Sequence, residues 1–414
     1  MAEVGPLKLE KSLELFEQAK GLIPGGTLGI RRPYNFVEGE YPIFFDSGKG
    51  GRVTDVDGNE YIDFLCAYGP VILGYREEEI DDAVIAQVRD KGFCFSLTQS
   101  HQNALAAKLR ELIPCAEMSI FVKTGSDAMT LAVRLARAHT GRTGVLRCGY
   151  HGWHDWCVEV KGGIPEKLYE DVREFHYNDL AGLEKLLAEH GNDTAAITLT
   201  PFGHPLAAPM QEPKPGFLEG VRALADKHGV VLVFDEVRTG FRISMGGAQE
   251  YYGVTPDLGC FGKAMANGYA ISAVCGRADI MKKAEKEVFV SSTFFPNSDG
   301  YVAALKTVEI LERDNVLAAV WDKGRRLMNS LRDAVSNTAV GAELTGIPPM
   351  FFITFKKDEA KLYRKRRTAF YTQLVRRGVF MQPYHHGYVC YRHTREDLAQ
   401  AVAAAREALG AAGE

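Results

Sequence analysis

From about residue 61 onward, short apolar runs alternate with longer segments of helical periodicity, and this alternation restricts the possible folds more than any other feature. The apolar runs are Ser119–Val122, Gly144–Leu146, Ala195–Leu199 and Val230–Phe234. The helical segments lie near 77–91, 102–113, 127–140, 179–190 and 216–228. Runs without polar alternation are typical of parallel strands buried on both faces. The pattern predicts an α/β fold with a mostly parallel central sheet and helices on both faces.

The two ends of the chain have a different pattern, and each is predicted to form a small α+β piece. A helix is expected over 10–22, and Asp57-Gly58 between two strand-like runs indicates a hairpin. Near the other end, Phe351–Phe355 has the composition of a strand, and an Ala-rich helix begins at Asp397.

Charge and cysteine usage exclude several classes of protein. The 414 residues carry 49 Lys+Arg and 53 Asp+Glu, a net charge of −4, which argues against nucleic acid or an anionic membrane as a partner. The segment 1–20 lacks the apolar core of a signal peptide, and no run of about 18 apolar residues predicts a membrane span. The eight cysteines form no C-x-x-C pair and are interpreted as reduced thiols. We expect a soluble cytoplasmic protein without a metal site.

Two familiar nucleotide motifs do not occur in the sequence. No G-x-G-x-x-G opens a helix after a strand, and the segment around Gly262-Lys263 fails the P-loop pattern because Ala264 follows the lysine. A different anion site has more support. The Gly125-Ser126 turn follows a strand and precedes a helix, so it offers N–H groups, a hydroxyl and the positive helix end. Taken alone, this turn is better explained as a helix N-cap at Ser126.

Two further residues are candidates for a functional site because each follows a predicted strand. Asp235 ends the run 230–234, and a carboxylate at the carboxyl end of a parallel strand lies where open α/β sheets bind ligands. Lys263 follows the apolar run Leu258–Phe261, where burial would lower its pKa and make the amine nucleophilic. Taken singly, Asp235 is also explained as a turn or helix-capping residue, and Lys263 as a solvated surface residue.

These three features have a joint meaning. A phosphate-binding turn, a strand-end acid and a nucleophilic lysine are what pyridoxal 5′-phosphate (PLP) requires. The lysine forms a Schiff base, the acid keeps the ring nitrogen protonated, and the turn anchors the phosphate. PLP is therefore the predicted cofactor.

The order and spacing of several motifs resemble the class III, fold-type I PLP aminotransferases, close to the glutamate-1-semialdehyde 2,1-aminomutases. The resemblance covers about residues 20–410 and rests on Pro24-Gly25-Gly26, Asp55–Asn59, Gly125–Ala128, Tyr150-His151-Gly152, Phe234–Arg242, Thr255–Leu258, Gly262-Lys263 and His393-Thr394. It implies a homodimer with shared active sites. It also implies a large PLP-binding domain over 61–320 and a small domain built from 1–60 and 321–414.

The resemblance assigns catalytic and ring-binding roles. Lys263 matches the Schiff-base lysine, which also shuttles a proton, and Asp235 matches the partner of the pyridine nitrogen. Val237 and Tyr150 match the residues that pack on the two faces of the cofactor ring.

Other roles concern the oxygen atoms of the cofactor. Gly125 and Ser126 match the phosphate-binding turn, and Thr293 matches a phosphate ligand donated by the neighbouring subunit. His204 lies near the position from which relatives donate to the phenolic oxygen. The Glu-Pro pair of many relatives is replaced here by Thr200-Pro201.

Three segments resemble more closely the aminopentol aminotransferases that deaminate hydrolysed fumonisin: Cys66–Pro70, Ala266–Ser272 and Pro383-Tyr384-His385. This resemblance favours a bulky or long-chain amine as substrate. Trp153 and Trp156 are explained equally by a wall for such a substrate and by ordinary packing. An arginine fork suits the carboxylate of a keto acid. The candidate substrate residues are Arg31, Arg32, Tyr68, Trp153, His385 and Arg392.

The predicted function is a PLP-dependent aminotransferase that moves an amino group from an amine to a keto acid, such as pyruvate, by a ping-pong mechanism. The first alternative is glutamate-1-semialdehyde 2,1-aminomutase, in which the transfer is intramolecular. A catalytically idle relative that binds only cofactor or partners is disfavoured, because Lys263 and all its supporting residues are present.

Overall fold

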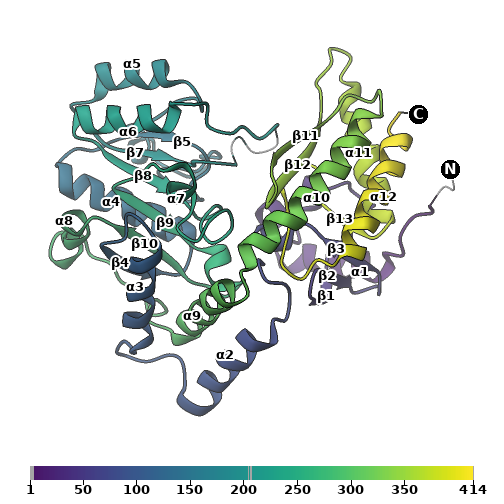
Figure 1. Cartoon of the computed structure of the whole chain (residues 1–414), viewed down its shortest axis with the longest axis horizontal. Coiled ribbons are helices and arrows are strands. Elements are labelled where there is room, and N and C mark those ends of the chain that lie inside the picture. The colour runs from purple at the N-terminus through teal and green to yellow at the C-terminus, as the bar shows by residue number, and fades with distance from the viewer. Residues whose placement is uncertain (1–3, 204, 206–207, 414) are drawn as a thin grey trace. The chain divides into compact units, whose positions relative to one another are not determined.

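The computed structural model describes residues 4–203, 205 and 208–413, which form two compact units (Figure 1). Unit 1 contains the described residues of Met1–Glu77, Leu206–Met210 and Ala318–Glu414, and unit 2 those of Glu78–Pro205 and Gln211–Leu317. The units thus change at Glu77 and Leu317, whereas the sequence places these boundaries near 60 and 320. All eight cysteines are free thiols. Among the described residues, no helix combines the length and the apolar character needed to cross a membrane.

Unit 2 is built on a seven-stranded sheet with the order β4-β10-β9-β8-β7-β5-β6. The strands are β4 (Met118–Val122), β5 (Gly144–Cys148), β6 (Val172–Glu174), β7 (Thr194–Leu199), β8 (Val231–Asp235), β9 (Leu258–Phe261) and β10 (Ser272–Gly276). Neighbouring strands from β6 to β9 are parallel, and β10 is antiparallel to both β9 and β4. The predicted, mostly parallel sheet is therefore confirmed.

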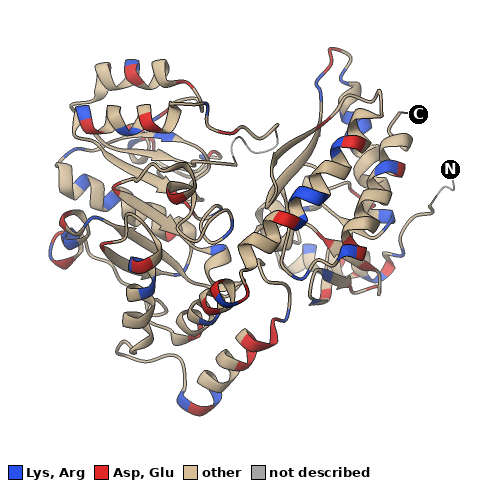
Figure 2. Ribbon diagram, in the orientation of Figure 1, with Lys and Arg blue, Asp and Glu red and all other residues tan. Residues whose placement is uncertain are grey.

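The helices of unit 2 are α2 (Glu78–Lys91), α3 (His101–Leu112), α4 (Gly125–Thr140), α5 (Leu180–His190), α6 (Phe217–His228), α7 (Ala248–Tyr252), α8 (Ala278–Met281) and α9 (Ser298–Arg313). The five predicted helices correspond to α2 to α6. In α2, acidic residues occupy the first turn and basic residues the last (Figure 2), which complements the helix dipole.

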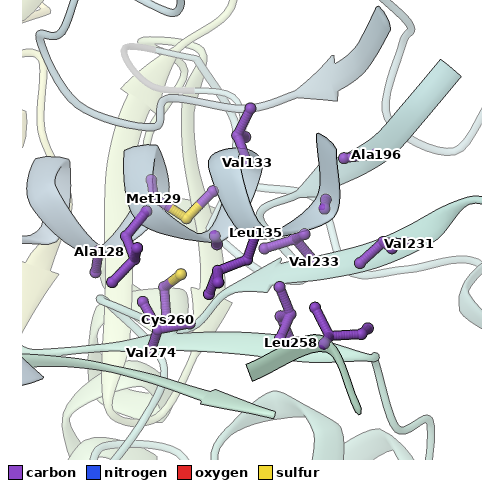
Figure 3. Close-up of a cluster of buried hydrophobic side chains, with 14 of the residues drawn as sticks. Ala128, Met129, Val133, Leu135, Ala196, Val231, Val233, Leu258, Cys260 and Val274 are labelled. Atoms are coloured by element: carbon purple, nitrogen blue, oxygen red, sulfur yellow. The ribbon is translucent and has the colours of Figure 1, made fainter. Parts of the chain in front are cut away.

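Successive residues of the central strands pack on opposite faces of the sheet. Val231 and Val233 of β8 belong to the cluster beneath α4 that Figure 3 shows, whereas Leu232 and Phe234 pack on the face covered by α5 and α6. The same alternation puts Asp235, two residues beyond Val233, on the face covered by α4.

Unit 1 contains two smaller sheets. The first has the order β1-β2-β3-β13 and the second β11-β12-β14. Their strands are β1 (Phe45–Lys49), β2 (Arg52–Asp55), β3 (Glu60–Asp63), β11 (Ala342–Ile347), β12 (Met350–Phe355), β13 (Val379–Phe380) and β14 (Gly387–Tyr388). The helices are α1 (Glu10–Leu22), α10 (Val316–Ser336), α11 (Leu362–Arg376) and α12 (Arg395–Ala411). Because β13 pairs in parallel with β3, both ends of the chain build this unit, as the resemblance implied.

Gly324, in the interior of α10, generates a prediction about stability. A Cβ at this position would lie 1.9 Å from the carbonyl oxygen of Pro348, so one backbone segment would have to move. Alanine is normally favoured over glycine in a helix by about 0.5–1 kcal/mol. We nevertheless expect Gly324→Ala to lower the free energy of unfolding by about 1–3 kcal/mol through overpacking.

Gly21, in α1, provides the matched control, because a Cβ there would meet nothing within 4 Å. Gly21→Ala should raise the free energy of unfolding slightly or leave it unchanged. Thermal unfolding of both variants checks this contrast. A Tm for Gly324→Ala at or above that of Gly21→Ala would contradict it.

Candidate active site

Three segments of unit 2 meet beside the end of β8. A Cβ on Gly125, at the start of α4, would lie 3.0 Å from both methyl carbons of Val237. A Cβ on Gly152 would lie 2.3 Å from Oγ of Ser126, and the N–H of Trp153 donates to that same oxygen at 3.3 Å. The first turn of α4, the loop 149–153 and the turn after β8 are therefore in direct contact.

The first turn of α4 has two N–H groups without a partner inside the helix. Thr124 is the N-cap: its Oγ1 accepts from the N–H of Asp127 at 3.1 Å, and its own N–H donates to Asp127 Oδ2 at 2.9 Å. The interpretation of Ser126 as the N-cap is thus wrong. This capping box provides a hydrogen-bond acceptor for the N–H of Asp127. The N–H groups of Gly125 and Ser126 have no acceptor within the helix and lie at its positive end, where an anion is stabilised.

Asp235 is buried, with 6% of its surface exposed, and its carboxylate is held from two sides. Its Oδ2 lies 2.9 Å from Nδ1 of His151, and its Oδ1 accepts from the N–H of Val237 at 3.2 Å. Because a carboxylate only accepts hydrogen bonds, His151 donates from Nδ1. His151 is itself buried, and its Nε2 has no partner among the described residues.

No role was predicted for His151, although it lies within the Tyr150-His151-Gly152 motif that carried part of the resemblance. That motif is the signal from which His151 could have been found.

Lys263 begins the turn that follows β9, next to β8 in the sheet. Its φ of +48° is uncommon for a residue with a side chain and indicates a conformation imposed by the surroundings. Burial lowers the pKa of Lys263 from 10.5 to about 7, the charge of Arg238 acts in the same direction, and Asp235 opposes it. Near neutral pH a large fraction of the amine is therefore uncharged and nucleophilic.

The remaining candidates of unit 2 differ in exposure. Val237 is half-buried, and Tyr150 is 43% exposed, with a pKa that burial raises. Trp153 and Thr293 are exposed. Trp156 is buried and donates from Nε1 to Thr130 Oγ1 at 2.9 Å, so packing explains this tryptophan. His204 lies outside the described residues.

Three of the substrate candidates in unit 1 lie together. The guanidinium of Arg31 lies 5.4 Å from the ring centroid of Tyr68, and the ring of His385 meets the Tyr68 ring edge to face at 5.1 Å. The Tyr68 hydroxyl donates to the carbonyl oxygen of Ile30 at 3.0 Å. Arg31 and Tyr68 also line a cavity of about 340 Å³ within this unit.

The other two arginines have different partners. Arg32 donates from Nε to the carbonyl oxygen of Thr27 at 3.4 Å. Arg392 donates from Nε and Nη2 to the two carboxylate oxygens of Glu77, at 2.9 and 2.6 Å. The fork of Arg392 is thus already occupied by a carboxylate of its own chain.

Unit 1 also contains a buried cluster of Cys66, Cys390 and His393, whose sulfur and nitrogen atoms lie within 4.8 Å of one another. Nδ1 of His393 accepts from the N–H of Cys390 at 3.0 Å, and Nε2 lies 3.2 Å from the carbonyl oxygen of Asp63. Because hydrogen bonds engage both ring nitrogens, we assign no metal to this cluster.

Comparison with known proteins shows the family to which the chain belongs. The family model for class-III aminotransferases matches residues 34–396. The chain is 65% identical over 403 residues to the 3-aminobutyryl-CoA aminotransferase of Cloacimonas acidaminovorans, covering 97% of each chain. It is 34% identical over 431 residues to the glutamate-1-semialdehyde 2,1-aminomutase of Pelotomaculum thermopropionicum, covering 98% of each. The solved PLP form of FumI from Sphingopyxis sp. MTA144 has a TM-score of 0.92 and 32% identity, covering 97% of this chain and 96% of that one.

The chain therefore belongs to the class-III aminotransferases. It is a PLP-dependent aminotransferase of fold type I, and the predicted enzyme class, fold and cofactor are confirmed.

The environment of Lys263 generates a prediction about pH dependence. In protein freed of cofactor, covalent labelling of Lys263 by an amine reagent should follow an apparent pKa near 7, because burial disfavours the ammonium form. Labelling of exposed lysines should follow an apparent pKa of about 10.4. Asp235→Asn should lower the value for Lys263 further, since Asp235 favours the charged amine. Mass spectrometry of labelled peptides at several pH values provides the measurement, and labelling of Lys263 that begins only in alkali would contradict the prediction.

Proposed function

We propose that this enzyme transfers the amino group of a 3-aminoacyl thioester, such as 3-aminobutyryl-CoA, to a keto acid. The observation that carries the proposal is the 65% identity, over 97% of both chains, to the enzyme of that name. The aminomutase relative is much more distant, at 34% identity. Loss of the amine from such a donor leaves a 3-oxoacyl thioester, and a keto acid such as pyruvate becomes an amino acid. Coenzyme A would make the donor a bulky amine, which the sequence favours.

The residues at the ends of β8 and β9 fit PLP. Bound there, PLP supplies an electron sink that stabilises the negative charge left on the amine-bearing carbon. We assign Lys263 to holding the cofactor and moving a proton at Nζ, because burial leaves a substantial fraction of its amine uncharged near neutral pH. We assign Asp235 to keeping the ring nitrogen protonated, since His151 and the Val237 N–H orient its carboxylate.

The other cofactor contacts follow from the same arrangement. We assign the phosphate to Gly125 and Ser126, whose N–H groups have no partner inside α4. Val237 and Tyr150 are proposed to contact the two faces of the ring. His204 is proposed as the donor to the phenolic oxygen.

We propose that, in a homodimer, Thr293 binds the phosphate group of the PLP held by the neighbouring subunit. Its loop is flanked by Phe289 and Phe294, which are 80% and 58% exposed. Large apolar side chains that gather on a surface favour an interface with another protein chain. A homodimer that shares its active sites would cover them.

For the substrate we propose the group formed by Arg31, Tyr68 and His385 in unit 1. In unit 2, the exposed ring of Trp153 is a separate candidate. The exposed guanidinium of Arg31 suits the phosphate groups of coenzyme A. Arg32 and Arg392 are set aside, because their guanidinium groups are engaged by Thr27 and Glu77.

The catalytic assignments predict distinct effects for two substitutions. Lys263→Ala should abolish turnover and the visible absorbance of the bound cofactor. Asp235→Asn should retain cofactor but lose rate by a factor on the order of 10² or more, because a neutral amide cannot hold the ring proton. Steady-state kinetics and absorption spectra of the purified variants test both effects. Near-normal kcat in either variant would remove that residue from its role.

The proposed substrate predicts which donors react. With pyruvate or another keto acid present, purified enzyme should convert 3-aminobutyryl-CoA to the 3-oxoacyl thioester and release the corresponding amino acid. Free 3-aminobutyrate, the matched control without coenzyme A, should react far more slowly, because remote binding energy is lost. Mass spectrometry of both products provides the measurement. Rapid isomerisation of glutamate-1-semialdehyde without any acceptor, and no turnover of the thioester, would favour the aminomutase instead.

A further inference from the structure

Arg238 is a buried cation that has no counter-ion among the described residues. It lies in the turn after β8 and is 8% exposed. Its Nη1 donates to the carbonyl oxygen of Gly203 at 2.7 Å, and its Nε has no hydrogen-bond partner among the described residues. No ion pair formed within the described part of the chain includes Arg238.

Two other shielded arginines of the chain are paired with acids. Arg147, which is 7% exposed, pairs with Glu174, and Arg376 forms two hydrogen bonds of 2.7 Å to the carboxylate of Glu40. An unpaired buried charge is costly, so a guanidinium is normally buried together with the anion that it binds. Arg238 departs from this rule.

The neighbouring acid Glu236 does not satisfy Arg238. Its carboxylate accepts from the hydroxyl of Thr239 and from the N–H groups of Ala248 and Gln249, the last two at 2.7 and 2.9 Å. These bonds fix the turn that carries Arg238. The guanidinium is therefore held in place by the chain, but its charge is left for a ligand.

Arg238 lies beside the groups that perform the chemistry. It follows Val237 directly, and Val237 contacts the phosphate-binding turn at Gly125. Its charge lowers the pKa of Lys263 and opposes the burial that raises the pKa of Tyr150. A ligand of Arg238 would therefore be close to the reacting amine.

We propose that Arg238 binds the carboxylate of the keto-acid acceptor. This inference rests on the proposed function, in which the two substrates differ: the keto acid has a carboxylate next to its reacting carbon, whereas the thioester donor has only a neutral carbonyl. A guanidinium fork binds both oxygens of a carboxylate. The carboxylate ligand is thus Arg238 rather than Arg31, Arg32 or Arg392, which the sequence suggested.

The test compares Arg238→Met, which keeps the length of the side chain without its charge, with Arg238→Lys. In Arg238→Met, the KM for the keto acid should rise about 30-fold or more. The KM for 3-aminobutyryl-CoA should stay within about twofold, because that donor presents no anion there. Arg238→Lys should restore part of the loss, since lysine keeps the charge but not the fork. For an aldehyde acceptor, which lacks a carboxylate, the KM should be about the same in all forms.

Two readouts do not depend on turnover. Propanoate, an unreactive carboxylate, should perturb the cofactor absorbance of the wild-type holoenzyme and bind about 30-fold more weakly to Arg238→Met. In cofactor-free protein the pKa of Lys263 should rise in this variant, because a neighbouring cation has been removed while Asp235 and Arg242 remain. Arg277→Met serves as the control, since Arg277 pairs with Asp257 and Asp279, and it should leave both substrate KM values unchanged.

The outcomes separate this inference from the proposed function. An unchanged keto-acid KM in Arg238→Met overturns the carboxylate role while leaving the thioester donor in place. Loss of bound cofactor without a change in keto-acid KM also overturns the carboxylate role. That result would indicate that Arg238 binds PLP. Failure of the wild-type enzyme to use 3-aminobutyryl-CoA overturns the proposed donor, and propanoate binding still decides the role of Arg238. If Arg238→Met does not fold, the same measurements on Arg238→Lys decide it.

Discussion

Burial of the central sheet on both faces is the constraint on which unit 2 depends. The inner strands direct apolar side chains toward α4 on one side and toward α5 and α6 on the other, so charge is confined to the ends of strands. Asp235 and Lys263 lie at such ends on neighbouring parallel strands. The surroundings that hold this core together also set the state of both groups: His151 orients the carboxylate, and burial keeps much of the amine uncharged.

The parts of the fold with strong local patterns were predictable from the sequence. Helices α2 to α6 and strands β4, β5, β7 and β8 lie within a few residues of the expected ranges, because periodicity and apolar runs are local properties. Strand β6 consists only of Val172–Glu174, and β13 only of Val379–Phe380. Such short strands carry little signal of their own and are defined by the partners with which they pair.

The candidate site, too, could be predicted from the sequence only in part. Lys263 and Asp235 were found because the position of a residue after an apolar run can be seen along the chain. The meaning of His151 and Arg238 comes from contacts over long separations, such as the His151–Asp235 hydrogen bond between residues 84 positions apart. A sequence does not distinguish an arginine with a counter-ion, such as Arg392 beside Glu77, from one that has none within the described part of the chain, such as Arg238.

The pairing of β3 with β13 has a consequence for the order in which the protein is made. Unit 2 comes from an almost continuous stretch of chain, whereas the first sheet of unit 1 lacks its last strand until Val379 and Phe380 have left the ribosome. During most of translation, β3 therefore keeps an open edge that any extended segment can pair with. A pause in synthesis shortly before Val379 prolongs the interval in which the nascent chain is most exposed to aggregation.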